Sequence, residues 1–137
     1  MTGGRFHALS DDQLKRLLAG ELAHGGFLDP GGAEQPRETC SKVEQVWYEL
    51  SQVLQAEAAC GAEQTDRIPE MVGYSSAAQV QATARKLAAL GDAEVRARCE
   101  GALMEATPEE VIAAVAELRA FYQRAAANGD AVLFRVS

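Results

Sequence analysis

The run AVLFRV at residues 131–136 constrains the fold of this chain more than any other stretch. Its apolar and β-branched composition is typical of a strand, in which Val132 and Phe134 share one face and Leu133 lies on the other. A strand this apolar needs cover and a hydrogen-bonded partner. The only comparable run is Arg5–Leu9, so we expect the N- and C-terminal strands to pair in a small sheet packed under the helices.

Five stretches between these strands have the three- and four-residue apolar spacing of amphipathic helices. Each begins at a residue whose side chain can cap a helix N-terminus: Ser10, Ser41, Ser75 or Ser76, Asp92 and Thr107. Gln13, Glu44 and Glu110 follow three of these caps at the spacing of a capping box. The strongest apolar pattern should line the core: Val43, Val46, Trp47, Leu50, Val53 and Leu54. The last helix should end at Asn128–Gly129.

Two stretches interrupt the helical pattern. Residues 24–36 (HGGFLDPGGAEQP) are rich in glycine and proline and predict a loop. Residues 61–74 (GAEQTDRIPEMVGY) predict a polar connection with a short extended piece at Met71–Tyr74. The length of 137 residues suits one domain. We therefore expect a single α+β domain over residues 1–137, with about five helices packed on the small terminal sheet.

Cysteine usage and hydropathy indicate a cytoplasmic protein. The chain has three cysteines, an odd number, and no two of them have a CxxC spacing: Cys40, Cys60 and Cys99. If residues 40–60 form one helix, its ends lie about 30 Å apart, which is too far for a disulfide. We therefore expect free thiols. No apolar run approaches the roughly 18 residues of a membrane-spanning helix, and no secretory signal is visible, so we expect no membrane contact.

The charge of the chain bears on its partners. It has 20 acidic and 13 basic residues, for a net charge of −7. The basic residues form no cluster, which argues against nucleic-acid binding. An acidic surface suits a basic protein partner, because opposite charges fit each other and speed encounter. Solubility alone would also explain the acidity, and both interpretations stay open here.

Six acidic residues gather around the two connections that flank the helix of Trp47. We predict that they bind a partner: Glu34, Glu38, Glu57, Glu63, Asp66 and Glu70. A solvated acidic surface without a partner is the alternative interpretation. A catalytic carboxylate pair would need burial to separate its two pKa values, and nothing in the sequence indicates that.

The sequence shows no recognisable catalytic, metal or cofactor motif. His7 has Asp11 and Asp12 nearby in the chain, but no second ligand follows at a metal-binding spacing, so we expect it at the surface or at a strand edge. The glycines of GGFLDPGG do not form a phosphate-binding motif. The serines and Thr107 stand at expected helix caps. We therefore predict no catalytic residue, no metal and no cofactor.

Three segments share a pattern with a known family. FYQRAAANGDAVL (121–133) joins aromatic and arginine residues to an Asn-Gly turn and a closing strand. GYSSAAQVQATARKLAAL (73–90) leads from Gly-Tyr into a helix, and ALSDDQLKRLL (8–18) contains the opening helix. Together they resemble the YfbM-like family, bacterial domains of unknown function 1877. The resemblance covers most of the chain and implies an α+β fold with a small sheet and several helices.

The chain departs from this family pattern around Trp47. The family carries an Asp-Lys-x-Trp segment with a histidine four residues after the tryptophan. Here Gln45 and Val46 precede Trp47, and Ser51 takes the histidine position. The long loop that follows in the family is reduced to about residues 61–73. The resemblance therefore implies a fold more than a function.

These observations favour a non-enzymatic cytoplasmic module that binds a protein. Its most concrete form is an immunity protein that binds and neutralises a toxin or effector through an acidic face. The alternative is a small enzyme or small-molecule-binding domain of unknown substrate. Its site would draw on the following residues: His7, Trp47, Tyr48, Tyr74 and Tyr122. The aromatic members also suit a plain core, and homodimerisation or another structural role is left open.

Overall fold

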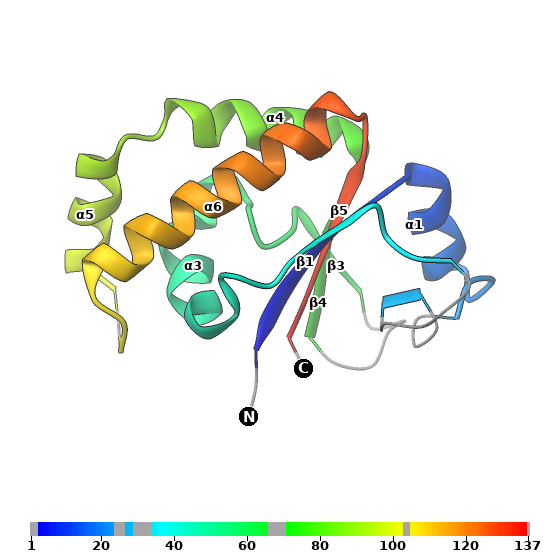
Figure 1. Ribbon diagram of the computed structural model, residues 1–137, viewed down its shortest axis with the longest axis horizontal. Coiled ribbons are helices and arrows are strands. Elements are labelled where there is room, and N and C mark those ends of the chain that lie inside the picture. The colour runs from blue at the N-terminus through cyan, green and yellow to red at the C-terminus, as the bar shows by residue number, and fades with distance from the viewer. Residues whose placement is uncertain (1–2, 24–26, 29–33, 66–70, 103–104, 137) are drawn as a thin grey trace.

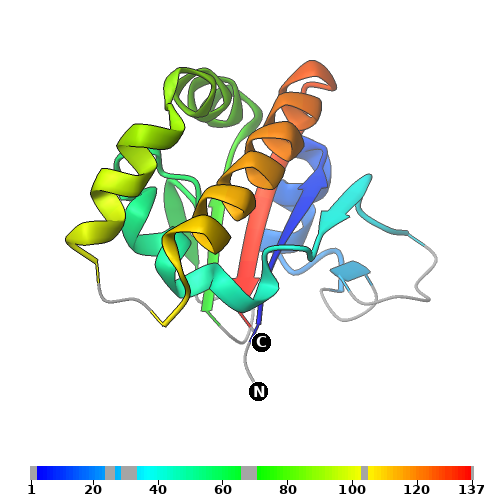
Figure 2. The same ribbon diagram turned by 60° about the vertical axis from the view of Figure 1, so that its left-hand side comes forward.

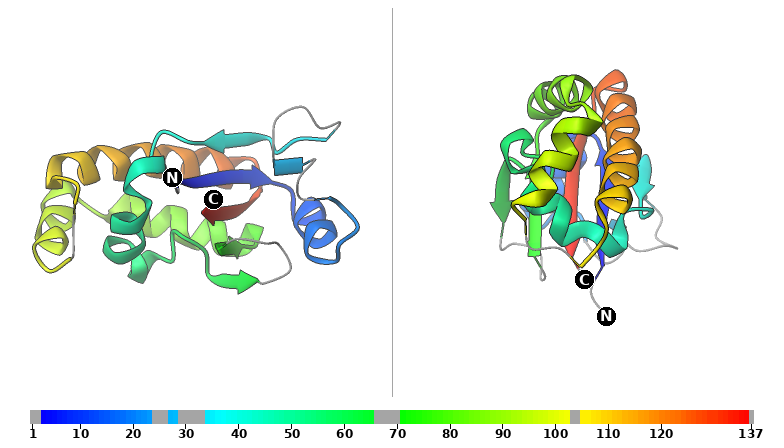
Figure 3. Two further views of the ribbon diagram at one scale, coloured as in Figure 1. Left: turned by 90° about the horizontal axis from the view of Figure 1, so that it is seen from below. Right: turned by 90° about the vertical axis from the view of Figure 1, so that its left-hand side faces the viewer.

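The computed structural model describes residues 3–23, 27–28, 34–65, 71–102 and 105–136, with twelve helices and strands in chain order. These are β1 (Gly4–Leu9), α1 (Asp11–Leu18), β2 (Glu38–Cys40), the 3₁₀ turn η1 (Glu44–Val46), α3 (Trp47–Val53), η2 (Gln55–Glu57), β3 (Glu63–Thr65), β4 (Met71–Ser75), α4 (Ala77–Ala89), α5 (Asp92–Glu100), α6 (Pro108–Ala127) and β5 (Ala131–Val136). The predicted α+β fold with five α-helices is confirmed for the described residues. Helices α5 and α1 lie at opposite ends of the molecule (Figure 1; Figure 3, left).

The five strands form one antiparallel sheet in the order β2-β1-β5-β4-β3. The predicted pairing of the two terminal strands is confirmed, and its register places Phe6 opposite Phe134. The prediction missed the position of β5 in the middle of the sheet, where it pairs with β1 on one side and β4 on the other. The last strand therefore holds the two halves of the sheet together.

One face of the sheet contributes to the larger hydrophobic core. Phe6, Val132 and Phe134 pack there with apolar residues of the helices, among them Leu87 of α4 and Leu118 of α6, all of them buried. Figure 2 shows α6 crossing in front of β5. This arrangement follows from the alternation of side chains along β5 and from the 3.6-residue period of α6.

The opposite face of the sheet contributes to a second, smaller core. Leu9 and Leu133 pack there with Leu14 and Leu17 of α1 and with Phe27. All six residues of β5 are consequently buried. β5 therefore contributes to both cores, and the burial of its apolar side chains on each face stabilises the fold.

Helices α1 and α4 each begin at a predicted capping residue. Ser10 caps α1 and Ser76 caps α4, and each forms a complete capping box with the glutamine three residues later. Ser76 rather than Ser75 is therefore the cap of α4. These two starts depend only on neighbouring residues, which explains why the sequence predicts them well.

The starts of α5 and α6 differ in detail from the prediction. Gly91, not Asp92, is the N-cap of α5, and Asp92 is its first helical residue, where its charge faces the positive end of the helix dipole. Thr107 caps α6 by accepting a hydrogen bond from the Glu110 N–H at 3.2 Å, as predicted. The Glu110 carboxylate lies 3.2 Å from the Thr107 hydroxyl instead of closing the predicted box on the backbone.

The prediction of one continuous helix from Ser41 onward is wrong. Ser41 caps nothing; the chain makes a turn, then η1, α3 and η2. Val46 and Leu54, with φ of −115° and −106°, separate these pieces. The breaks let apolar side chains of η1 and α3, together with Leu54, reach the same core. The distance argument for Cys40 and Cys60 therefore rests on a helix that does not form, although all three cysteines are free as expected.

The stretch 61–74 contains more structure than predicted. The extended piece at Met71–Tyr74 is confirmed as β4, but it pairs with β3, a strand of only three polar residues that the sequence pattern missed. Gly73 is required in β4, because a Cβ there would lie 2.2 Å from the Cys60 carbonyl oxygen. Close packing of two backbone segments thus fixes this part of the sheet.

The glycine-rich stretch 24–36 is not simply a loop. Phe27 and Leu28 are helical and buried, and they cover the sheet face beside α1. His24 lies outside the described residues. Gly129, with φ of 68°, ends α6 at the predicted Asn-Gly turn. No helix in the described part of the chain is long and apolar enough to span a membrane.

Candidate functional site

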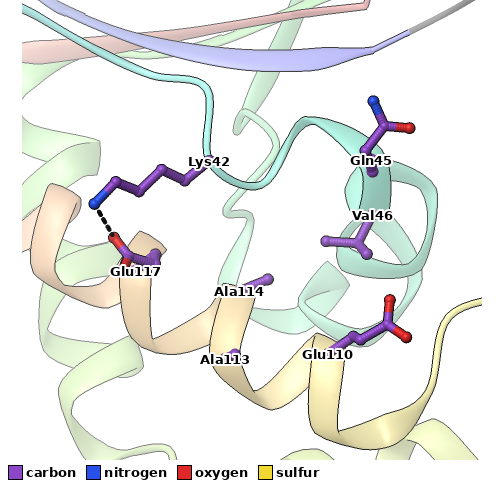
Figure 4. A pocket seen from close by; sticks show the side chains of 7 residues that line it. All are labelled: Lys42, Gln45, Val46, Glu110, Ala113, Ala114 and Glu117. Carbon is purple, nitrogen blue, oxygen red and sulfur yellow. Dashed lines mark ion pairs between the residues drawn. The ribbon is translucent and has the colours of Figure 1, made fainter.

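A groove between η1 and α6 is the first candidate site. Its volume is about 380 Å³. It is lined by Lys42, Gln45, Val46, Glu110, Ala113, Ala114 and Glu117 (Figure 4). None of these residues was a predicted site residue. The one sequence feature that could have indicated this groove is the spacing of residues 110, 113, 114 and 117, which places them on one face of α6.

The groove has an apolar floor with a carboxylate at each end. Ala113 and Ala114 form the floor on α6, and Glu110 and Glu117 stand about 10.5 Å apart along the helix axis, at a rise of about 1.5 Å per residue. Lys42 reaches Glu117, with Nζ 3.7 Å from Oε2 (Figure 4). Both partners are largely exposed, so this ion pair is weak. At this end of the groove, Lys42 of the chain itself therefore offsets the negative charge of Glu117.

Carboxylates accumulate at the other end of the groove. Glu49 of α3 is only 6% exposed. Burial raises the pKa of Glu49, and the negative charges of Glu105 and Glu110 raise it further. Within the described ranges, no lysine, arginine or histidine forms an ion pair with any of these three carboxylates. This end of the groove therefore carries unneutralised negative charge.

Tyr48 of α3 is an exposed aromatic residue. Its side chain is 49% exposed and is the one exposed large hydrophobic residue in the described part of the chain. Its ring lies edge-on to the partly buried Trp47 ring, with centroids 5.7 Å apart. An exposed tyrosine held against a second aromatic ring is a common anchor in protein interfaces.

Glu34 and Glu57, two of the six acidic residues predicted to bind a partner, are held in internal ion pairs. Glu34 accepts hydrogen bonds from both terminal nitrogens of Arg16, each at 3.1 Å, and these bonds, with one from Gln13, lower the pKa of Glu34. Glu57, 7% exposed, lies 2.6 Å from Arg98. Their charges are therefore balanced within the chain.

The remaining predicted residues are spread over the molecule. Glu38 on β2 pairs with Arg124 of α6, while Glu63 is exposed on β3. Because β2 and β3 are opposite edges of the sheet, these two backbones are about 19 Å apart, at about 4.8 Å per strand. Asp66 and Glu70 lie outside the described residues. The structure thus does not bring the described members together on one face, and their binding of a partner stays a prediction.

The residues suggested for an enzyme or ligand site are also separated. Tyr122 is buried in the larger core and donates a hydrogen bond to the Ala59 carbonyl, while Tyr74 packs against the smaller core. Tyr48 points to solvent. The expectation of a surface or strand-edge position for His7 is wrong: it is 1% exposed on β1, an interior strand. Its Nδ1 lies 2.9 Å from the Thr39 hydroxyl.

The described cysteines lack the environment of reactive thiols. Burial raises the pKa of all three, and that of Cys60 to about 12. Among the described residues, no group of three or more His, Cys, Asp or Glu side chains is arranged to hold a metal ion.

Comparisons with known proteins agree with this fold. The sequence matches the family described as a domain of unknown function, DUF1877, over residues 2–135. The structure is similar to that of YfbM from Escherichia coli, a protein of unknown function, with a TM-score of 0.67 and 15% sequence identity, covering 98% of this chain and 99% of that chain. No curated protein sequence matches. The chain belongs to the DUF1877 family.

Proposed function

We propose that the protein is a non-enzymatic module that binds a basic protein partner, and that the groove between η1 and α6 receives a lysine or arginine side chain of that partner. In its most concrete form the partner is a toxin or effector that the protein neutralises. The observation that carries the proposal is the negative charge around Glu110 at one end of the groove, where Glu110 and Glu105 act on the buried Glu49 and none of the three has an ion-pair partner among the described residues.

The chemistry of the groove supports this choice of partner. A basic side chain can lay its aliphatic stem on Ala113 and Ala114 and place its charge at Glu110. Lys42 already makes an interaction of this kind at the Glu117 end. A partner cation at Glu110 would offset the repulsion among the three carboxylates, so the attraction is larger than for one isolated charge.

Tyr48 supports a protein rather than a free cation as the occupant. Exposed tyrosine offers a large apolar area together with a hydroxyl, and it loses little conformational entropy on binding. It stands on α3, three residues after Gln45 of the groove and next to Glu49. A partner that fills the groove can therefore also cover Tyr48.

The test is affinity capture from a lysate of the source organism by the tagged full chain, eluted with rising salt. We expect one basic protein in stoichiometric amount, released only at high salt because the contact is electrostatic. Glu110→Lys should abolish its capture. Glu21→Lys, at an exposed residue that follows α1 and does not line the groove, makes the same charge change and should leave capture intact.

Two outcomes would contradict the proposal. One is a chain that captures no basic partner; the other is a partner that is lost equally with both lysine variants, which would indicate general charge attraction. The toxin form has its own test. A captured partner that inhibits growth when expressed alone, and does not when co-expressed with this protein, would support neutralisation.

A further inference from the structure

A second cavity lies on the face of the sheet that also carries the smaller core. Its volume is about 300 Å³, at the lower end of the range for small-molecule sites. It is lined by Arg5, His7, Leu28, Gln35, Thr39, Ser41 and Glu44. It shares no lining residue with the groove of the proposed function.

The alternation of β1 produces this cavity. Arg5, His7 and Leu9 point to the same face of the sheet, but only Leu9 is part of the apolar cluster that α1 covers. Thr39 of β2 stands opposite His7 and holds its ring through Nδ1 at 2.9 Å. The face is thus apolar beside α1 and polar beyond it, and the cavity opens over the polar half.

Two arginines meet at this polar half. Arg5 of β1 and Arg135 of β5 are directly opposite in the strand register, so they share a face. Arg135 is 4% exposed and donates to the Leu28 carbonyl at 3.4 Å. Like charges at opposite positions of an antiparallel pair are unfavourable. In a chain of net charge −7, this pair concentrates positive charge at one place on the sheet.

One carboxylate of the described residues lines the cavity. Glu44 lies 3.5 Å from Arg5, and both side chains are about one third exposed to solvent, at 31% and 38%. This spacing is longer than a charge-assisted hydrogen bond, so the Arg5 guanidinium is not tightly held. The other polar lining groups near Arg5 include the hydroxyls of Thr39 and Ser41, which can donate hydrogen bonds.

We propose that this cavity binds a small ligand through an oxyanion group, either a phosphate or a carboxylate. An arginine fork matches both groups with two parallel hydrogen bonds, and hydroxyl donors complete their coordination. The cavity volume limits the ligand to a small molecule rather than a polymer chain.

The test is a titration of the ¹⁵N-labelled full chain, at constant ionic strength, with inorganic phosphate in one series and succinate in another. Chloride is the control for simple screening. We expect saturable shifts of the amide signals of Arg5, His7, Thr39 and Ser41 in at least one series. The series with the tighter binding identifies phosphate or carboxylate as the recognised group.

Variants of the two charged lining residues should act in opposite directions. Arg5→Gln should weaken binding roughly tenfold or more, because it removes a charged bidentate contact. Glu44→Gln should tighten binding, because it removes the carboxylate that competes for Arg5. Arg96→Gln, which removes an exposed arginine paired with Glu109, is the matched control and should change nothing.

The results that overturn the proposal are equally clear. One such result is that neither phosphate nor succinate produces a saturable shift. The other is that Arg5→Gln and Arg96→Gln weaken binding to the same extent. Glu44→Gln keeps the proposal testable if Arg5→Gln fails to fold. A Glu44→Gln variant that binds neither anion more tightly than the original chain would also contradict it.

Discussion

The rings of Phe6 and Phe134 lie directly opposite each other on β1 and β5, with centroids 4.6 Å apart and planes inclined by 35°. Phe121 of α6 lies 6.4 Å from Phe6, and Trp47 of α3 lies 6.5 Å from Phe134. This aromatic cluster joins the two ends of the chain to two helices. Its stability is therefore expected to control the stability of the whole domain.

Replacing Phe134 with alanine should lower the free energy of unfolding by about 3–5 kcal/mol, because it removes a buried ring and leaves a cavity beside the rings of Phe6 and Trp47. Urea denaturation followed by circular dichroism measures the change. Tyr48→Ala is the control, since its ring is half exposed, and we expect a loss under about 1 kcal/mol. Equal losses at the two positions would contradict the central role of the cluster.

Deleting residues 129–137 should abolish cooperative unfolding. The deletion removes β5, which pairs with β1 and β4 and contributes to both cores. The two remaining halves of the sheet would then have no strand between them. A thermal scan by circular dichroism tests this, and a truncated chain that still melts in one sharp transition would show that β5 is dispensable.

The ion pair of Glu57 and Arg98 should contribute far more than the ion pair of Glu94 with the same arginine. Glu57 is 7% exposed, so Glu57→Gln leaves a partly buried guanidinium without its closest charge, and we expect a loss of about 1–3 kcal/mol. Glu94 is exposed and one helical turn before Arg98, so Glu94→Gln should cost under about 0.5 kcal/mol. Urea denaturation of the two variants provides the comparison; equal losses would mean that burial is not decisive.

Glu49→Gln should stabilise the protein near neutral pH and not in acid. Burial and the neighbouring carboxylates raise the pKa of Glu49 in the folded state. As the pH rises from the unfolded pKa of about 4.3 through the raised folded pKa, the unfolded state loses its proton first, and stability falls. Glutamine removes this loss.

The check is the melting temperature of the original chain and of Glu49→Gln at pH 7 and pH 4. The variant should melt higher at pH 7, and the difference should disappear near pH 4. Glu63→Gln is the control, because Glu63 is exposed on β3, and no comparable gain is expected. A Glu49→Gln variant that is less stable at pH 7 would show that the carboxylate makes a favourable contact that outweighs its burial.

The three cysteines should be unreactive in the folded protein at pH 8. Burial raises the pKa of each thiol, so little of the reactive thiolate is present. Ellman's reagent should therefore label them slowly in native buffer and rapidly in guanidinium chloride. Rapid labelling of one thiol in native buffer would identify a local opening at that site.

Much of the fold could be predicted from the sequence wherever the signal is local. The strand at 131–136, the capping box at Ser10 and a helix start at Ser75 or Ser76 depend on residues within a few positions of one another, and all three formed as predicted. The opening of α5 at Gly91 differed because two neighbouring residues could serve as the cap. The helix around Trp47 broke into pieces because packing with distant residues outweighed its regular apolar spacing.

The candidate sites could not be predicted in the same way. Some of the acidic residues that are close together in the sequence, such as Glu34 and Glu57, form internal ion pairs with arginines of other segments. Glu110, whose only expected role was at a helix cap, became part of a groove because η1 packs beside α6. Net charge is a property of composition, but which charges remain unneutralised depends on distances in space.

The class of the fold, most of its helices and the pairing of its two terminal strands could be inferred from the amino-acid sequence alone. The fold class and the helices follow from side-chain periodicity and capping, which act over a few residues, and the pairing was inferred because the two terminal runs were the only comparable strands. The central position of β5, the burial of His7 and Arg135, and the polar cavity lined by His7 became evident only from the three-dimensional arrangement. The physical reason is that strand order, burial and charge balance arise from contacts between segments far apart in the chain, which no local pattern encodes.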